Sequence, residues 1–420
     1  MKRLTDLAAV LRALPSRATI VTHSACAEPT GLLQDLATHA ASASAPQLFS
    51  LMPMGSAPYA AAAISGRLEV TTFFSGKALR RPIDEGHVRT ERQPLSRIPA
   101  LFAPPSGRRV DLLLLRLSPP DAAGRFSLGV SVDYMRAVLD QRPLVIAEID
   151  PLTPRTTGDT WVTPAQIDYL VDAIDGPVNV QRSEPSDVDR RIADHVATLV
   201  HDGAVIQTGI GAIPDQVALR LGHLRNLGVH SGTLTDALVP LIRSGVVTNA
   251  AKRQFAGRSV ATMATGSSVL YDFLNDNPEI ALHPCSLTHD RSLLSSITGL
   301  CAINSALEVD LSGAVNAEHM DGRIIAGPGG LPDFAFGAAR APNGMSIIAL
   351  RATSRDAQRS NVRPRLDPSY PATAEGDAVD FIVTEFGIAS IKGLRGRSRA
   401  RAIALVAHPA FRDALLDAVD

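Results

Sequence analysis

The chain has 420 residues, of which 41 are lysine or arginine, 42 are aspartate or glutamate, and 45% are hydrophobic. At about 100–200 residues per domain, this length predicts two or three globular domains. The formal net charge of −1 gives no general electrostatic attraction to nucleic acid or to an anionic membrane. The apolar run at residues 110–117 contains Asp111 and Arg116 and is far too short to span a bilayer. We therefore expect a protein that binds neither nucleic acid nor membrane.

The N-terminal residues favour an amphipathic helix over a signal peptide. Leu4, Leu7 and Leu11 recur at helical spacing, and charged residues interrupt the apolar stretch. The 3 cysteines are odd in number and form no Cys-x-x-Cys pair, so neither a disulfide framework nor a zinc site is expected. These features predict a cytoplasmic protein with no metal site.

Short β-branched or leucine-rich runs then alternate with helical segments along the whole chain. Buried strands are predicted at residues 18–23, 110–117, 143–149, 204–208, 346–350 and 378–384, and helices at 29–41, 187–201 and 214–224. This alternation predicts an α/β protein with mainly parallel sheets. Proline, glycine and polar residues gather at 176–188 and predict a domain boundary there, dividing the chain into 1–183 and 184–420.

Two glycine-rich stretches are the first candidates for a site. In VIQTGIGAIPD (205–215) a predicted strand runs into a glycine turn and a helix with proline near its start. Gly209 and Gly211 allow a ligand to approach the backbone, although the spacing is not that of a dinucleotide fingerprint. AGPGGLPDF (326–334) predicts a loop shaped by glycine. Each stretch is equally consistent with an ordinary turn.

Taken together, the motifs resemble those of the acetyl-CoA hydrolase/transferase family, which includes 4-hydroxybutyrate and butyryl-CoA:acetate CoA-transferases. The matching stretches, in family order, are SPPDAAGRFSLGVSVD (118–133), IAEIDPLTPRTTGD (146–159), QTGIGAIPD (207–215), YDFLNDNPEI (271–280), AINSALEVDLSGAVNAE (302–318), GPGGLPDF (327–334), DFIVTEFGIASIKG (380–393) and AHPAFR (407–412). The resemblance implies two related open α/β domains and a homodimer. It also implies acyl-CoA and a small carboxylic acid as substrates, with no permanently bound cofactor.

The resemblance further implies a mechanism and a set of site residues. A glutamate carboxylate attacks the acyl-CoA, and an enzyme-bound glutamyl-CoA thioester follows, which is covalent catalysis. Backbone N–H groups of a glycine turn would stabilise the oxyanion. By position, the residues implied to bind CoA are Gln207, Thr208, Gly209, Ile210, Gly211, Gly327, Gly329 and Gly330. Arg355 is a candidate partner for the CoA phosphates.

One departure from the family pattern concerns the nucleophile. In the stretch LGVHSGTLTD (227–236), Gly232 occupies the position of the family's glutamate, and glycine has no nucleophile. Three readings follow. Glu318 supplies the carboxylate for transfer or hydrolysis; or water is activated by Glu318 or His230; or the protein binds CoA without turning it over. The alternative to the first two readings is that Glu318 and His230 are structural residues. We carry Glu318 forward as the predicted catalytic residue.

Overall fold

The computed structural model describes residues 1–419 except 106, 182 and 183. It divides into two compact units. The first unit contains Met1–Gln181, Ala261–Leu287 and Arg323–Gly327, and the second contains Arg182–Val260, Thr288–Gly322 and Pro328–Asp420. The units are therefore not two consecutive halves of the chain, since two segments beyond residue 184 return to the first unit.

The first unit is built on an eight-stranded sheet in the order β1-β10-β8-β6-β2-β3-β4-β5, in which every neighbouring pair of strands is parallel. Its strands are β1 (Lys2–Arg3), β2 (Thr19–Thr22), β3 (Gln47–Ser50), β4 (Glu69–Thr72), β5 (Val88–Thr90), β6 (Leu112–Leu117), β8 (Leu144–Ile149) and β10 (Tyr169–Asp172). All six residues of β6 are buried, because a parallel sheet is covered on both faces.

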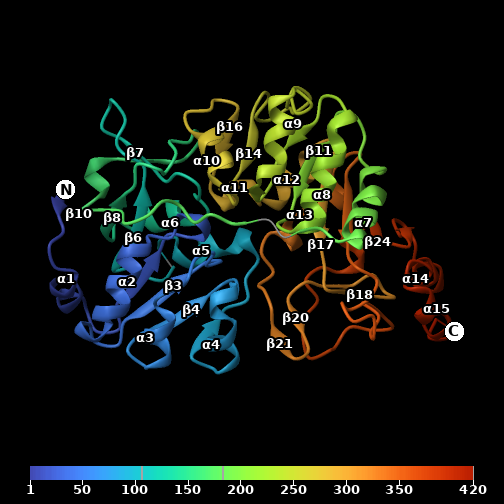
Figure 1. Ribbon diagram of the computed structural model, residues 1–420, viewed down its shortest axis with the longest axis horizontal. Helices are drawn as coiled ribbons and strands as arrows, with labels where there is room; N and C mark the ends of the chain where they lie inside the picture. Colours follow the sequence, from blue (N-terminus) through green and yellow to red (C-terminus); the bar gives the residue numbers. More distant parts are fainter. Residues whose placement is uncertain (106, 182–183, 420) are drawn as a thin grey trace. The chain divides into compact units, whose positions relative to one another are not determined.

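Short helices cover this sheet, and Figure 1 shows α2, α3 and α4 following one another along it. The helices of the first unit are α1 (Leu7–Ala13), α2 (Thr30–His39), α3 (Ala60–Ile64), α4 (Arg80–Asp84), α5 (Ile98–Phe102), α6 (Met135–Leu139) and α10 (Ser268–Leu274). Leu11, Leu33 and Leu36 from α1 and α2 pack on Ile20 and Leu112 of the sheet. The helical spacing of leucines in the first residues thus produces the predicted amphipathic helix.

The second unit is built on a six-stranded sheet in the order β12-β11-β17-β22-β24-β25. These strands are β11 (Val205–Thr208), β12 (Gly228–Val229), β17 (Leu300–Ser305), β22 (Met345–Ala349), β24 (Phe381–Thr384) and β25 (Gly387–Ser390). Within this sheet, as far as the structure describes it, only the β24–β25 pair is antiparallel. A small sheet in the order β19-β18-β23 accompanies it, made of β18 (Glu308–Asp310), β19 (Val315–Asn316) and β23 (Val362–Arg363).

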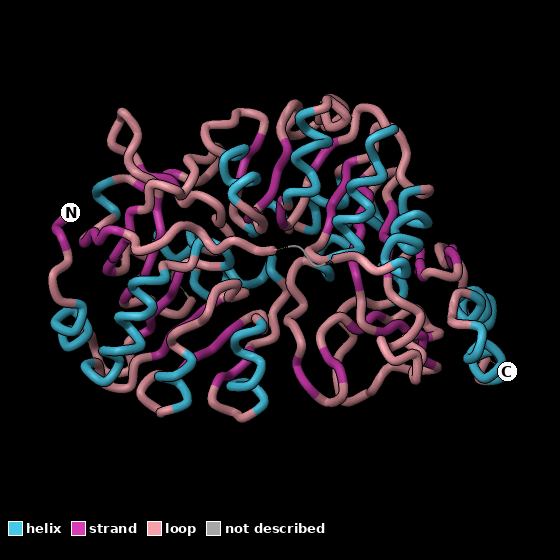
Figure 2. The backbone as a smooth tube through the Cα atoms, in the orientation of Figure 1, coloured by secondary structure: helices cyan, strands magenta, loops and turns pink. Residues whose placement is uncertain are grey.

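The helices of the second unit pack in pairs, α7 on α8, α12 on α13, and α14 on α15. Figure 2 shows the helices and strands of each unit alternating along the backbone. The helix bounds are α7 (Asp187–Ala197), α8 (Ala212–Arg220), α9 (Val239–Arg243), α12 (Arg291–Ser296), α13 (Leu331–Arg340), α14 (Gly396–Leu405) and α15 (Pro409–Asp417). Ser186 and Asp189 form a capping box that starts α7 at Asp187, the residue at which the predicted helix begins.

The remaining elements are short strands and single turns of helix. The strands are β7 (Phe126–Ser127), β9 (Trp161–Val162), β13 (Thr233–Leu234), β14 (Ser259–Ala261), β15 (Met263–Ala264), β16 (Ile280–Leu282), β20 (His319–Met320) and β21 (Arg323–Ile324), and the helix is α11 (Cys285–Thr288). Within the described part of the chain, no helix combines the length and the apolar character needed to cross a membrane.

The predicted α/β fold with mainly parallel sheets is confirmed. The strands predicted at 110–117 and 204–208 appear as β6 and β11, each slightly shorter. The helix predicted at 214–224 begins earlier, at Ala212, because Pro214 is accommodated in the first turn, where its missing N–H costs no helical hydrogen bond. In both sheets the strand order reverses, beside β2 in the first unit and beside β11 in the second. Open α/β sheets bind ligands at the carboxyl ends of strands at such points.

Candidate active site

The glycine turn after β11 lies at the reversal of strand order in the second unit. Gly211 has φ of +135° and precedes α8, and no described side chain caps this helix end. A Cβ placed on Gly209 would meet no described atom closer than Pro214 Cγ at 3.8 Å, and φ of Gly209 is not positive. Packing within the protein therefore does not require glycine at position 209. The turn leaves room for a ligand beside the N–H groups that open α8.

Gln207 and Thr208 end β11 in buried positions with different surroundings. The Gln207 amide exchanges two hydrogen bonds with the Asn304 amide, at 3.2 and 3.0 Å, and so links β11 to β17. The Thr208 hydroxyl is buried, and no described group lies within hydrogen-bonding distance of it. A buried hydroxyl without a partner is uncommon and marks a position where a ligand group can bond. Of these two predicted residues, Thr208 thus has the side chain available for a ligand.

Gly232 and Gly330 converge on the imidazole of His289. A Cβ on Gly232 would stand 3.0 Å from His289 Nε2, and a Cβ on Gly330 would stand 2.6 Å from the same atom. Both glycines are half-buried, whereas His289 is fully buried. The direction that a side chain at position 232 would take is therefore occupied by the His289 ring.

The His289 ring is held by Thr288 and Phe334. Its Nδ1 lies 2.8 Å from Thr288 Oγ1, and the ring packs edge-on against Phe334 with centroids 4.9 Å apart. Burial, with a smaller effect from the nearby His230, lowers the pKa of His289 from 6.5 to about 3. The ring is consequently neutral at physiological pH.

His230, the histidine singled out from the sequence, lies in the same cluster but is engaged. Its Nε2 lies 3.0 Å from the backbone oxygen of Thr288, and it is fully buried. His289 could not be identified from the sequence, because no short motif or fixed spacing connects it to the two glycines beside it.

The loop at 327–330 contains three glycines, each in a different structural situation. A Cβ on Gly327 would stand 2.2 Å from the Phe73 backbone oxygen within the first unit, so close approach of two backbone segments requires glycine there. Gly329 has φ of +55°, the left-handed conformation that glycine adopts without strain. Gly330 precedes α13, and no described side chain caps that helix end. The CoA-binding role predicted for these three glycines stays a prediction.

Glu318 is buried beside the small three-stranded sheet. Its Oε1 accepts a 2.8 Å hydrogen bond from Thr373 Oγ1, and its backbone N–H donates to Asn316 Oδ1 at 3.1 Å. Thr373 also uses its Oγ1 to accept from the Ala317 N–H. The carboxylate is therefore built into a local network, and its catalytic role stays a prediction. Arg355, the candidate phosphate partner, is exposed.

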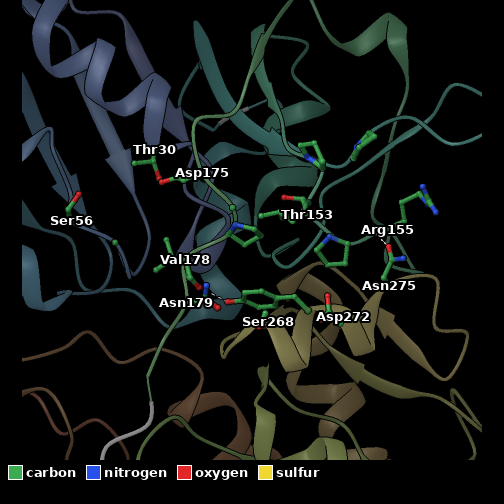
Figure 3. Close-up of a pocket in the computed structure, with 18 residues that line it drawn as sticks. Thr30, Ser56, Thr153, Arg155, Asp175, Val178, Asn179, Ser268, Asp272 and Asn275 are labelled. Atoms are coloured by element: carbon green, nitrogen blue, oxygen red, sulfur yellow. Dashed lines mark hydrogen bonds between the residues drawn. The ribbon is translucent and has the colours of Figure 1, made fainter.

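A cavity of about 660 Å³ lies within the first unit (Figure 3). None of the predicted site residues is among the described residues that line this cavity. The lining residues are Thr30, Gly55, Ser56, Pro119, Pro151, Leu152, Thr153, Pro154, Arg155, Asp175, Gly176, Pro177, Val178, Asn179, Ser268, Tyr271, Asp272 and Asn275. In the close-up Thr30 and Asp175 point toward one another, and Tyr271 donates a 2.6 Å hydrogen bond to the Val178 carbonyl.

Arg116 lies behind this cavity, fully buried in β6. Its guanidinium donates to Asp150 Oδ2 at 2.9 Å, to Asp175 Oδ1 at 2.6 Å and to Thr30 Oγ1 at 3.3 Å. A buried arginine with this many partners is satisfied and holds several segments together. We interpret this network as structural. Among the described residues, no group of three histidine, cysteine or carboxylate side chains could hold a metal ion.

Comparisons with known proteins match both parts of the chain. Residues 4–180 match the acetyl-CoA hydrolase/transferase N-terminal domain, and residues 266–419 match the acetyl-CoA hydrolase/transferase C-terminal domain. The 4-hydroxybutyrate coenzyme A transferase of Clostridium kluyveri is 33% identical over 404 residues, which cover 96% of this chain and 94% of that protein.

Solved structures match along the same length. The crystal structure of RipA from Yersinia pestis superimposes with a TM-score of 0.91 at 32% identity, covering 99% of this chain and 96% of that one. The 4-hydroxybutyrate CoA-transferase of Porphyromonas gingivalis gives a TM-score of 0.82 at 28% identity, covering 97% and 95%.

Proposed function

The chain belongs to the acetyl-CoA hydrolase/transferase family and is an enzyme of that class, and from this premise we propose that it acts on a small acyl-CoA thioester, moving CoA to a carboxylic acid or to water. The relative from Clostridium kluyveri is a 4-hydroxybutyrate CoA-transferase, so short acyl chains are the substrates to test first.

The observation that carries this proposal is the turn after β11. Gly209 has space around its Cα that the fold does not fill, and the Thr208 hydroxyl beside it has no partner among the described residues. Both positions stand next to the N-terminus of α8, where backbone N–H groups favour an anion. An acyl-CoA thioester develops an oxyanion when it is attacked, and such N–H groups stabilise it.

Within this proposal, Gln207–Gly211 and Gly327, Gly329 and Gly330 contact CoA, and Glu318 is the predicted carboxylate for a covalent route. We further expect a homodimer in the cytoplasm, which the family resemblance implies. Sedimentation velocity of the purified protein tests the homodimer, and a single species of monomer mass would contradict it.

The experiment for the function is to incubate the purified protein with butyryl- and 4-hydroxybutyryl-CoA, each with and without acetate. Mass spectrometry follows the CoA species and the intact protein. New acyl-CoA that forms only with acetate indicates transfer, and free CoA released without acetate indicates hydrolysis. Thioesters that all stay unchanged, although CoA binds, would contradict the proposed function and leave a CoA-binding protein without turnover.

A further inference from the structure

His289 has a nitrogen that the fold leaves without a partner. The ring is fully buried, and no described residue offers a hydrogen bond to Nε2. An unpartnered N–H in a protein interior is rarer than an unpartnered lone pair. We therefore place the ring proton on Nδ1, where it donates to Thr288 Oγ1 at 2.8 Å. Nε2 then carries a lone pair and can accept a proton.

This lone pair lies beneath two backbone positions that have no side chains. Gly232 and Gly330 lie directly against Nε2, and both are half-buried. A water molecule that reaches the buried Nε2 from the side of these glycines meets no side chain at position 232 or 330. Gly330 also precedes α13, a helix of ten residues whose first N–H groups favour a nearby negative charge.

We propose that His289 is the general base for hydrolysis of the acyl-CoA thioester. The inference rests on the proposed function and assigns a residue to one of its two outcomes. A water molecule gives a proton to Nε2 while its oxygen bonds to the thioester carbonyl carbon. The tetrahedral intermediate then expels the CoA thiolate as the carbon–sulfur bond breaks. The imidazolium returns the proton to the thiolate, so that the products are the carboxylic acid and CoA.

The surroundings of His289 suit this step. Burial keeps the ring neutral at physiological pH, so Nε2 carries no proton, but the same low pKa makes the imidazole a weak base until negative charge develops beside it. The negative charge that develops on the intermediate favours the imidazolium at the moment when the proton is transferred. His230 is a poorer candidate, since its Nε2 already lies 3.0 Å from the Thr288 carbonyl oxygen.

Water and a carboxylate acceptor place different demands on this residue. Water must lose a proton to attack the thioester, whereas an acceptor carboxylate is already ionised and attacks without a base. Loss of His289 should therefore reduce hydrolysis and leave acceptor-dependent transfer, where it occurs, much less affected. A purely structural histidine would lower both activities together.

The test compares wild type, His289→Gln and His289→Ala for release of CoA from acetyl- and butyryl-CoA without acceptor. His201→Gln serves as the matched control, because His201 is an exposed histidine of the same unit. We expect His289→Gln to lower the hydrolysis rate by about 10²–10⁴-fold, the usual contribution of a general base, with CoA affinity and Tm nearly unchanged. Added imidazole should restore at least a tenth of the wild-type rate to His289→Ala.

Should the glutamine variant fail to fold, His289→Asn, which is smaller, replaces it. Hydrolysis within threefold of wild type in a folded His289 variant would overturn the proposal, as would a folded His289→Ala that imidazole does not rescue. Wild-type protein that transfers CoA to acetate but releases none to water would overturn the role of His289 while the proposed function stands. Wild-type protein without either activity would instead remove the proposed function.

Discussion

Gly330 lies so close to His289 that a Cβ at position 330 would stand 2.6 Å from Nε2 and 2.8 Å from Cδ2. Real Cβ contacts essentially never fall below 3.0 Å, and the Phe334 ring behind His289 restricts its movement. Glycine at 330 is therefore required by the histidine itself, whatever the loop does with CoA. The same ring accounts for the limited space at Gly232.

A pair of alanine substitutions separates packing from ligand binding. Gly330→Ala should lower the free energy of unfolding by about 1–3 kcal/mol, the usual range for overpacking a core position. Gly209→Ala should leave it nearly unchanged, because the nearest described atom to its Cβ is 3.8 Å away. Denaturant unfolding followed by circular dichroism measures both. Equal stability of the two variants would contradict the packing derived for Gly330.

Gly209 should instead matter for CoA. A bulkier side chain at this position would enter the space beside the N-terminus of α8. We expect Gly209→Val to weaken CoA binding at least about tenfold, or 1.4 kcal/mol, as measured by isothermal titration calorimetry. CoA affinity equal to that of wild type would argue that the turn does not bind CoA.

The effect of placing a glutamate at position 232, where the family resemblance implies one, should depend on His289. The backbone at Gly232 has no positive φ, so a side chain is compatible with its conformation, and the closest described atom to a Cβ there is His289 Nε2 at 3.0 Å. We expect Gly232→Glu alone to be destabilised and inactive. Gly232→Glu combined with His289→Ala should fold more stably and form a protein–CoA adduct with acyl-CoA, detectable by intact-protein mass spectrometry. Destabilisation that simply adds in the double variant would show that the two positions do not interact.

The lowered pKa of His289 predicts two pH dependences. As the base, it should keep the hydrolysis rate level between pH 8 and 5, whereas a histidine with its ordinary pKa of 6.5 would lose rate below that value. In folding, a depressed pKa contributes stability that is present above pH 6.5 and is lost as the pH falls toward 3.

His289→Gln should therefore show a shallower loss of stability on acidification than wild type, by up to about 1.4 kcal/mol per pH unit. Urea unfolding at pH 7, 6 and 5 provides the comparison. If the free energy of unfolding changes with pH equally in the two proteins, His289 has an ordinary pKa. The expected constant hydrolysis rate between pH 8 and 5 would then have no explanation.

Glu318 gives a prediction that is independent of His289. If its carboxylate is the nucleophile for a covalent route, Glu318→Gln should abolish acceptor-dependent transfer and any protein–CoA adduct while CoA affinity is retained. The glutamine oxygen can still accept from Thr373 Oγ1, which lies 2.8 Å from Oε1, so the local network should survive. Unchanged transfer in this variant would reduce Glu318 to a structural residue.

Three features could be predicted from the sequence because each depends on residues that are neighbours in the chain. Buried β-branched runs indicate the strands, and Gly-x-Gly before a helix indicates the turn after β11. The start of α7 depends on Ser186 and Asp189, which form its capping box. The meeting of Gly232, His289 and Gly330 could not be predicted. These residues are far apart in the chain, and only tertiary packing brings them together. The contact of Gly327 with Phe73 escaped prediction for the same reason.

Arg116 illustrates a different difficulty. In the sequence it interrupts a leucine-rich strand, and hydrophobic patterning alone gives no reason for a buried cation there. The structure supplies the reason through Asp150 and Asp175, which come from later segments of the chain. Local patterns thus predict which elements form, whereas the partners of buried charges depend on how those elements assemble.

Single-turnover hydrolysis of acyl-CoA in ¹⁸O-labelled water tests the central claim most directly. If His289 activates water for direct attack on the thioester, the released carboxylic acid carries one ¹⁸O and the protein carries none. If a protein carboxylate forms a glutamyl-CoA intermediate, the acid takes an unlabelled oxygen from that carboxylate, and the label enters the protein. Label in the acid is the predicted result, and label in the protein would contradict it.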